Sequence, residues 1–468
     1  MKSFESYPTI ENLEQTFLMD TLHRNSFLYK FIELLSKIDD NFSICIDGEW
    51  GSGKTFFIKQ TQLVINSFYS ETDNAIQKKW KKDNQNHSDE KYSKKIVTVY
   101  YDAWENDNDD DPVLSLIYSI INELHTTNTL IDLNNNQIAE SLFKLVTAFT
   151  PFKEISDRIL DTKKAINGSD LLSDIYEQKN LHCHINHFFK SILPNNDEKI
   201  IIFIDELDRC NPRYAIKLLE RIKHYFQNPQ IIFVFTTNIN QLQHTIKQHY
   251  GHNFDACKYL ERFFDLQLFL PKVDNEVFLQ YLNIENPTTP NINIVCKQVI
   301  SYFNYSLREI EKYIKTINIA LGQFNEIAFD DGGPHHRAIL FCNEVIIPIL
   351  IGTKLHDINI FNDVISGHNP NIIINIISSI NNKEDLCKCL LNTHKETFSS
   401  SPSSNSGSYI QEVKISDRLE EVYNILFSSS ISGEYSKGHC CFTKHTQNYL
   451  FQTISLLSPF SSFDIENI

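Results

Sequence analysis

The stretch that decides the fold is Gly48-Glu49-Trp50-Gly51-Ser52-Gly53-Lys54-Thr55. It fits the pattern G-x-x-x-x-G-K-[ST], in which backbone N–H groups curl around a phosphate at the start of a helix. An apolar run at residues 42–46 precedes it and is typical of a buried strand, and Phe56-Phe57-Ile58 opens a helix after it. Strand, glycine-rich loop and helix thus follow in the order that a phosphate loop requires. The sequence therefore predicts binding of a nucleoside triphosphate.

Two residues of this phosphate loop (residues 48–55) have distinct expected roles. Lys54 is expected to reach the β- and γ-phosphates, and the Thr55 hydroxyl is expected to take a Mg²⁺ ligand position. The residues expected to contact the nucleotide here are Gly48, Glu49, Trp50, Gly51, Ser52, Gly53, Lys54, Thr55 and Phe56.

A second motif supplies acidic side chains at the end of an expected strand. The apolar strand expected at residues 199–204 ends in Asp205, Glu206 and Asp208. Asp205 stands at the carboxyl end of a strand, where parallel sheets bind ligands, and is expected to hold Mg²⁺. Glu206 is expected to be the general base or water-orienting group for hydrolysis, and Asp208 is the alternative or a helper. An acidic turn that merely caps a helix is the weaker interpretation behind an intact phosphate loop.

Asn238 follows the next expected strand, residues 230–235. There it suits a sensor that holds the attacking water, as in additional-strand ATPases. It suits equally the N-cap of a helix that begins near Gln241. The sequence leaves both interpretations open.

Apolar strands alternate with helical patterns along the first part of the chain. The expected strands cover residues 42–46, 95–101, 199–204, 230–235 and 265–270. We therefore predict an α/β fold: a P-loop NTPase core with a five-stranded parallel sheet of the additional-strand type, covered on both faces.

The expected domain organisation has three parts. Residues 1–271 form the core, with one helical stretch at about 13–38, a solvated insertion at 70–95 and a helical insertion at about 127–194. Residues 272–325 form a helical lid. Residues 326–468 form a mainly helical C-terminal region with a serine-rich linker at 399–408.

Composition limits the class of protein. The 468 residues carry a net charge of -16, which opposes binding to nucleic acid. The lysines around Trp80 form the one basic segment; it suits either phosphate contacts with base stacking or, as we favour, a solvated loop. We expect no transmembrane segment and no secretory signal, and the ten scattered cysteines indicate a cytoplasmic protein.

Two clusters of histidine and cysteine resemble metal ligands at first sight. They are His182-Cys183-His184 with His187, and His439-Cys440-Cys441 with His445. Neither has the paired spacing of a structural zinc site. The sequence therefore predicts no zinc.

Five motifs in order resemble the KAP family of P-loop NTPases. They are the tryptophan within the phosphate loop, Tyr101-Asp102-Ala103-Trp104-Glu105, the acidic run ending Asp208-Arg209-Cys210, the segment Lys258 to Phe264 followed by Leu270-Pro271, and Ser306-Leu307-Arg308-Glu309-Ile310. The resemblance spans about residues 18–325. The chain lacks the transmembrane insertion of many relatives and has Leu307 where they often have proline.

The resemblance implies an ATPase that binds ATP and Mg²⁺. It implies antiviral (phage) defence in bacteria, and action as a homo-oligomer or with other proteins. A nucleotide-dependent assembly switch with slow turnover is the first alternative, and a nucleic-acid motor is the second.

The resemblance also implies roles for two arginines. Arg262 suits an arginine finger that reaches a neighbouring subunit, or a salt bridge to Glu261 or Asp265. Arg308 suits a γ-phosphate contact, or pairing with Glu311 one helical turn away.

Overall fold

The computed structural model describes residues 7–69, 74–84, 95–126, 141, 181–193, 198–281, 290–322, 333–391, 414–428, 431 and 433–456. The chain divides into two compact units, an N-terminal unit (Ser6–Val273) and a C-terminal unit that begins at Asp274. Most of the expected helical insertion at 127–194 and the serine-rich linker at 399–408 lie outside the described residues.

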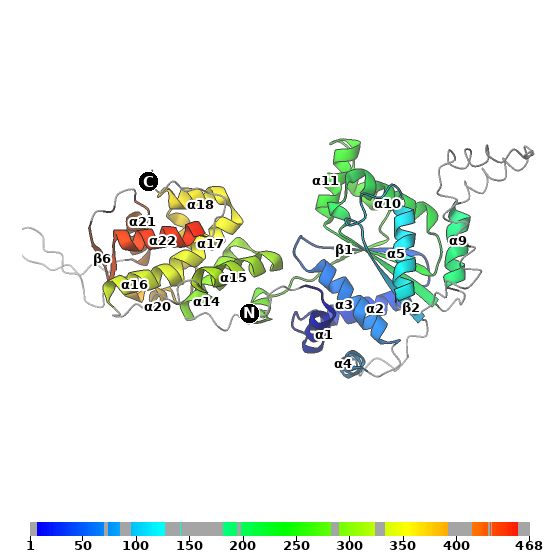
Figure 1. Cartoon of the computed structure of the whole chain (residues 1–468), viewed down its shortest axis with the longest axis horizontal. Coiled ribbons are helices and arrows are strands. Elements are labelled where there is room, and N and C mark those ends of the chain that lie inside the picture. The colour runs from blue at the N-terminus through cyan, green and yellow to red at the C-terminus, as the bar shows by residue number, and fades with distance from the viewer. Residues whose placement is uncertain are drawn as a thin grey trace, which may run out of the picture. The chain divides into compact units, whose positions relative to one another are not determined.

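The N-terminal unit is a sheet with helices around it (Figure 1). The strands are β1 (Phe42–Asp47), β2 (Lys95–Asp102), β3 (Glu198–Asp205), β4 (Ile231–Thr237) and β5 (Leu266–Phe269). The helices are α1 (Ile10–Met19), α2 (Asn25–Lys37), α3 (Lys54–Ser67), α4 (Ala75–Asp83), α5 (Pro112–Thr126), α9 (Leu181–Ile192), α10 (Pro212–Tyr225), α11 (Ile239–Tyr250) and α12 (Ala256–Leu260).

The sheet has the strand order β2-β3-β4-β1-β5, and every pair is parallel. β4 therefore lies between β1, which leads into the phosphate loop, and β3, which ends at Asp205. This inserted strand confirms the predicted five-stranded sheet of the additional-strand type. Because all strands run the same way, the ends of β1, β3 and β4 meet at one edge, where ligands of such sheets bind.

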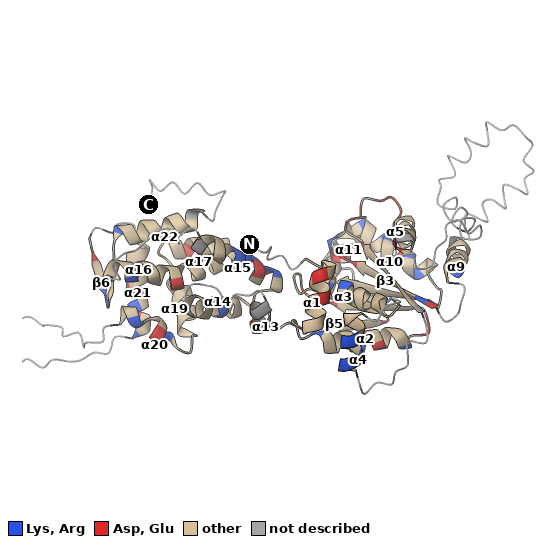
Figure 2. Ribbon diagram, turned by 60° about the horizontal axis from the view of Figure 1, so that its bottom comes forward, with Lys and Arg blue, Asp and Glu red and all other residues tan. Residues whose placement is uncertain are grey.

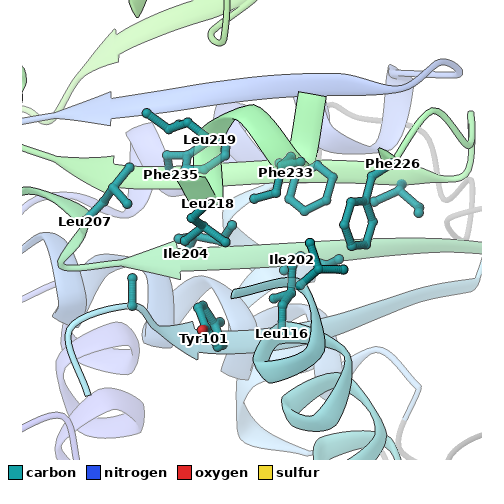
Figure 3. Packing of buried hydrophobic residues seen from close by; sticks show 14 of the residues in the cluster. Tyr101, Leu116, Ile202, Ile204, Leu207, Leu218, Leu219, Phe226, Phe233 and Phe235 are labelled. Atoms are coloured by element: carbon teal, nitrogen blue, oxygen red, sulfur yellow. The ribbon is translucent and has the colours of Figure 1, made fainter. Parts of the chain in front are cut away.

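Both faces of the sheet are buried because successive side chains of a strand point to opposite faces. In β3, Ile202 and Ile204 pack toward α5 and α10 (Figure 3). Ile200 belongs to the same cluster, which also includes residues of α9. Ile201 and Phe203 pack on the other face, against residues of α2 and α3. Phe226, Phe233 and Phe235 belong to the first of these two layers (Figure 3). A continuous apolar strand is therefore needed here, which explains why the sequence shows no polar alternation.

Two expectations for the N-terminal unit are wrong in detail. The single helical stretch at 13–38 is two helices, since Asp20 and His23 adopt positive φ of 49° and 51° between them. The segment at 70–95 is not only a solvated insertion, because α4 lies within it. Trp80 of α4 packs edge-on against Tyr29 and Phe68, with ring centroids 4.8 and 5.0 Å apart.

The C-terminal unit is mainly helical and carries one antiparallel hairpin. Its helices are α13 (Asn275–Tyr281), α14 (Pro290–Phe303), α15 (Leu307–Gly322), α16 (Pro334–Phe341), α17 (Ile347–His356), α18 (Ile358–Ile365), α19 (Asn371–Ser378), α20 (Lys383–Leu386), α21 (Ile415–Leu426) and α22 (Lys444–Leu456). A π-helical turn (Cys342–Ile346) joins α16 to α17, and a 3₁₀ turn (Lys388–Leu390) follows α20. The hairpin pairs β6 (Tyr435–Lys437) with β7 (Cys440–Phe442).

One continuous helix of the C-terminal unit, Pro334–His356, is long and apolar enough to cross a membrane by length and composition. Its apolar window is 72% buried within the protein. A core helix of a folded domain meets the same two criteria, so burial by neighbouring helices accounts for its composition.

Candidate active site

The phosphate loop connects β1 to α3, and its backbone conformation depends on glycine. Gly51 and Gly53 adopt positive φ of 76° and 88°, which other residues rarely tolerate. At Gly48, a Cβ atom would stand 2.9 Å from the Ser52 hydroxyl oxygen, so a side chain there would require the Ser52 hydroxyl to move. The Ser52 hydroxyl is itself buried without a hydrogen-bond partner in the described protein. The phosphate loop, the N-terminus of α3 and the unpaired Ser52 hydroxyl together form a site that suits an anion.

Lys54 begins α3 and turns back over the loop. Its Nζ donates hydrogen bonds to the carbonyl oxygens of Gly48, at 2.7 Å, and Glu49, at 3.0 Å. Burial lowers the pKa of Lys54, and the nearby carboxylates of Asp208 and Asp205 oppose that shift. The ammonium group therefore faces both the loop and the acids, where it is placed to meet phosphate oxygens.

The Asp205 carboxylate is the centre of the site. It is 1% exposed and lies at the end of β3. One oxygen accepts from the Thr55 hydroxyl at 2.6 Å and the Tyr100 hydroxyl at 3.2 Å. The other accepts from the Glu206 backbone N–H at 3.0 Å and from the Thr236 hydroxyl. All four donors are neutral, and among the described residues Asp205 has no ion pair, so its charge is left for a cation.

Glu206 occupies a strained position directly after β3. Its φ of 58° is left-handed, a conformation that is uncommon for a residue other than glycine. Burial, followed by the charge of Asp205, raises the pKa of Glu206 to about 7. Arg209 opposes this shift through an ion pair of 2.5 Å to the Glu206 carboxylate. The Arg209 guanidinium lies 5.5 Å from the ring centroid of Trp104, which holds it in place.

Asp208 joins the acidic turn (residues 205–209) to the phosphate loop. Its carboxylate accepts from the Trp50 indole N–H at 2.5 Å and from the Thr237 hydroxyl at 3.1 Å. Both of its oxygens are therefore engaged in holding other residues. The loop tryptophan is thus explained by a contact to a residue 158 positions away.

Arg24 is a residue that sequence reasoning missed. It precedes α2, is 5% exposed, and donates to the carbonyl oxygens of Ser52 at 3.0 Å and Pro271 at 2.5 and 3.0 Å. Burial lowers its pKa to about 10. A buried cation is costly, and this one ties the phosphate loop to Pro271, two residues after the end of β5. No local pattern marks it, because its partners lie 28 and 247 positions away.

Tyr100 and Thr236 were also missed, although a signal existed. Both lie on strands that neighbour β3 in the sheet, near the edge where Asp205 lies. A polar side chain near the end of an apolar strand is the pattern that identifies Asp205 itself, and it applies equally to Thr236.

Three expected site residues lie apart from these contacts. The Asn238 side chain caps α11, accepting from the Gln241 N–H at 3.3 Å, which fits one of its two interpretations. Arg262 is exposed after α12 and, within the described part of the chain, joins no ion pair; Asp265 pairs instead with Lys223. The described residues therefore show no salt bridge from Arg262 to Glu261 or Asp265, and the role of Arg262 stays a prediction.

Arg308 lies exposed on α15 in the C-terminal unit. Its expected alternative partner, Glu311, forms an ion pair with Lys315 at 3.3 Å. The role of Arg308 toward the γ-phosphate stays a prediction.

Residues 24–321 match the model described as the KAP family P-loop domain, which is more than half of the chain. No curated protein matches the sequence. Among solved structures, the chain is similar to the ORC2 protein of Aeropyrum pernix in its ADPNP–ADP complexes, with 11% identity and a TM-score of 0.32 over 96% of this chain and 95% of that one.

Proposed function

Since this chain belongs to the KAP family of P-loop NTPases, we propose that it binds ATP with Mg²⁺ and hydrolyses the terminal phosphoanhydride bond. The single observation that carries the proposal is the meeting of Thr55 and Asp205, whose side-chain oxygens lie 2.6 Å apart beside the phosphate loop. Hydroxyl and carboxylate oxygens are the ligands that Mg²⁺ prefers, and the buried Asp205 carboxylate forms no ion pair among the described residues.

Each group in the site has a place in this reaction. When bound, Mg²⁺ would neutralise negative charge on the phosphates of the nucleotide. Thr55 and Asp205 would hold it, and Lys54 exchanges its loop carbonyls for phosphate oxygens. Glu206 takes the proton of the attacking water, because its raised pKa makes it a base suited to neutral pH. Asp208 positions Trp50 and the loop, since both its oxygens are engaged.

The test separates binding from hydrolysis. Lys54→Ala should abolish ATP binding measured by calorimetry. Glu206→Gln should bind ATP with normal affinity and release phosphate only at the background rate. Asp208→Asn is the matched control for the base: it should weaken ATP binding through the loop and keep measurable turnover. Normal hydrolysis by Glu206→Gln together with none by Asp208→Asn would reverse the two assignments.

A second candidate is a nucleotide-dependent assembly switch with slow turnover. The Glu206–Arg209 ion pair favours it, because a base held by an arginine is withdrawn from water. Under this proposal the wild-type chain binds ATP tightly, hydrolyses it at the background rate, and changes its native mass on adding ATP. Steady-state ATP hydrolysis by the wild-type chain at a rate well above background would reject this second candidate.

The process that hydrolysis serves is proposed from family resemblance: antiviral defence in the cytoplasm of a bacterium, in concert with partner proteins. Expression of the wild-type chain with its neighbouring genes should reduce phage plaques, and Lys54→Ala in the same cassette should not. Equal plaque counts for both would remove this part of the proposal and leave the ATPase intact. The charge of -16 argues against the nucleic-acid motor, so DNA or RNA should not stimulate turnover.

A further inference from the structure

Three different metal-ligating side chains meet in the C-terminal unit. They are His335, Glu434 and Cys441, and their ligand atoms all lie within 4.8 Å of one another. The imidazole Nε2 of His335 is 3.8 Å from one carboxylate oxygen of Glu434. The Cys441 thiol donates to the other oxygen at 3.9 Å. One carboxylate thus lies between an imidazole and a thiol.

The hairpin explains why two of the three share a side. Cys441 pairs with Ser436 across β6 and β7, so Glu434, two residues before Ser436, is its diagonal neighbour on the same face. His335 comes from the first turn of α16, which packs against β7. The ligands come from segments about a hundred residues apart, which is why spacing in the sequence gave no zinc signal.

The opposite face of the hairpin is fixed in place. Adjacent residues of a strand point to opposite faces, and Cys440 points away from Cys441, toward the Cys389 carbonyl at 3.6 Å. The His439 N–H donates to the same carbonyl at 2.8 Å. Gly438, with φ of 61°, approaches the backbone of Leu390 too closely for any side chain. The hairpin that carries Cys441 is therefore held against Cys389 and Leu390.

The geometry is close to that of a tetrahedral site. Zinc bonds to sulfur, nitrogen and oxygen at about 2.3, 2.0 and 2.0 Å would place the ligand atoms roughly 3.3–3.6 Å apart. Glu434 and His335 are 72% and 55% exposed, so both side chains are free to close the remaining distance of about 1 Å. Cys441 is buried and stays in place.

We propose that His335, Glu434 and Cys441 form a zinc site that ties the β6–β7 hairpin to α16. Sulfur and nitrogen ligands select zinc over Mg²⁺ or Ca²⁺, which prefer oxygen. On binding, the S–Zn bond replaces the S–H bond and the thiol proton passes to solvent. Thiolate and carboxylate together neutralise the ion, and water fills the fourth position.

The test uses the metal-free full-length chain and Co²⁺ as a spectroscopic substitute for zinc. We expect one equivalent of Co²⁺ to produce a thiolate-to-metal charge-transfer band, and one equivalent of Zn²⁺ to remove it. Cys441→Ser should abolish the band. His335→Gln and Glu434→Gln, both at exposed positions, should each weaken binding by about ten-fold or more. His445→Gln, an exposed histidine on α22, is the matched control and should bind normally.

Three results would overturn the site. One is the absence of saturable Co²⁺ or Zn²⁺ binding by the wild-type chain. Another is a charge-transfer band that persists in Cys441→Ser but disappears in Cys440→Ser, which would place the metal at Cys389 and Cys440. The third is unchanged affinity in both His335→Gln and Glu434→Gln, which decides the question even if the cysteine variants fail to fold.

Discussion

Glu206 is a site residue whose pKa depends strongly on its neighbours. Burial and Asp205 raise its pKa to about 7, whereas Arg209 lowers it. As a base, Glu206 acts in its ionised form, so activity is present above this pKa and is lost as the pH falls through it. Arg209 therefore lowers the pH at which Glu206 becomes ionised and the site becomes competent.

The pH dependence of kcat/KM tests this role, because it reports groups of the free enzyme. In the wild type, kcat/KM for ATP should rise through about pH 7. In Arg209→Gln the rise should move to higher pH, since the stabilising positive charge is gone. Titration of ATP itself affects both proteins equally and cancels in the comparison. A rise that stays in place or moves to lower pH would contradict the assignment.

A second prediction at the scale of a single residue concerns Arg24. Arg24→Met removes hydrogen bonds from a charged donor to Ser52 and Pro271, which are worth about 1.5–3 kcal/mol of unfolding free energy. ATP affinity should fall as well, because the phosphate loop loses its support. Urea unfolding followed by tryptophan fluorescence measures this, since Trp50, Trp80 and Trp104 all lie in the N-terminal unit.

The matched control for Arg24 is Arg213→Met, an exposed arginine on α10, which should change stability by less than about 0.5 kcal/mol. Equal effects of the two substitutions would show that the Arg24 contacts do not support the loop.

Among the elements, α4 shows how packing overrides composition. Figure 2 shows its lysines in blue, and the segment looks like a solvated basic loop from its charges alone. Three contacts nevertheless hold it: Trp80 against Tyr29 and Phe68, and the Tyr29 hydroxyl donating to Asp83 at 2.7 Å. The tryptophan is a packing residue that attaches α4 to α2 and α3.

Trp80→Ala should therefore release α4. We expect faster amide hydrogen exchange across residues 75–83, with ATP binding unchanged, because the helix loses its apolar attachment. Trp80→Phe should keep most of the protection. A loss of single-stranded DNA binding in Trp80→Ala, with exchange unaltered, would instead favour a base-stacking role.

For the whole molecule, the open question is whether one subunit completes the site of another. Arg262 is exposed and is in no ion pair of the described residues, as an arginine finger in trans requires. Arg262→Ala should then lose hydrolysis while keeping ATP binding. Mixing the Arg262→Ala protein with the Glu206→Gln protein should restore part of the activity. In some subunit interfaces of the mixture, an intact Glu206 then meets an intact Arg262.

The native mass with and without ATP is the companion measurement to this mixing experiment. A mixture no more active than its two components, from a protein that is monomeric with ATP, would place Arg262 outside the reaction.

Most of the nucleotide site could be predicted from the sequence because its parts are local. The phosphate loop needs only glycines, Lys54 and Thr55 within eight positions, and Asp205 needs only the apolar strand before it. Strand boundaries were predicted to within two residues for the same reason. The break between α1 and α2 was missed because left-handed residues such as Asp20 and His23 interrupt a helix without changing its apolar pattern.

The sequence by itself determined the family, the parallel sheet and the identity of the phosphate loop, since short segments with their own periodicity encode these. Only the tertiary structure decided that Trp50 meets Asp208, that Arg24 supports the loop, and that His335 lies beside Cys441. The physical reason is that strand order and helix packing bring together residues far apart along the chain. Hydrogen bonds and metal ligation act over a few ångströms in space, and sequence spacing does not record that distance.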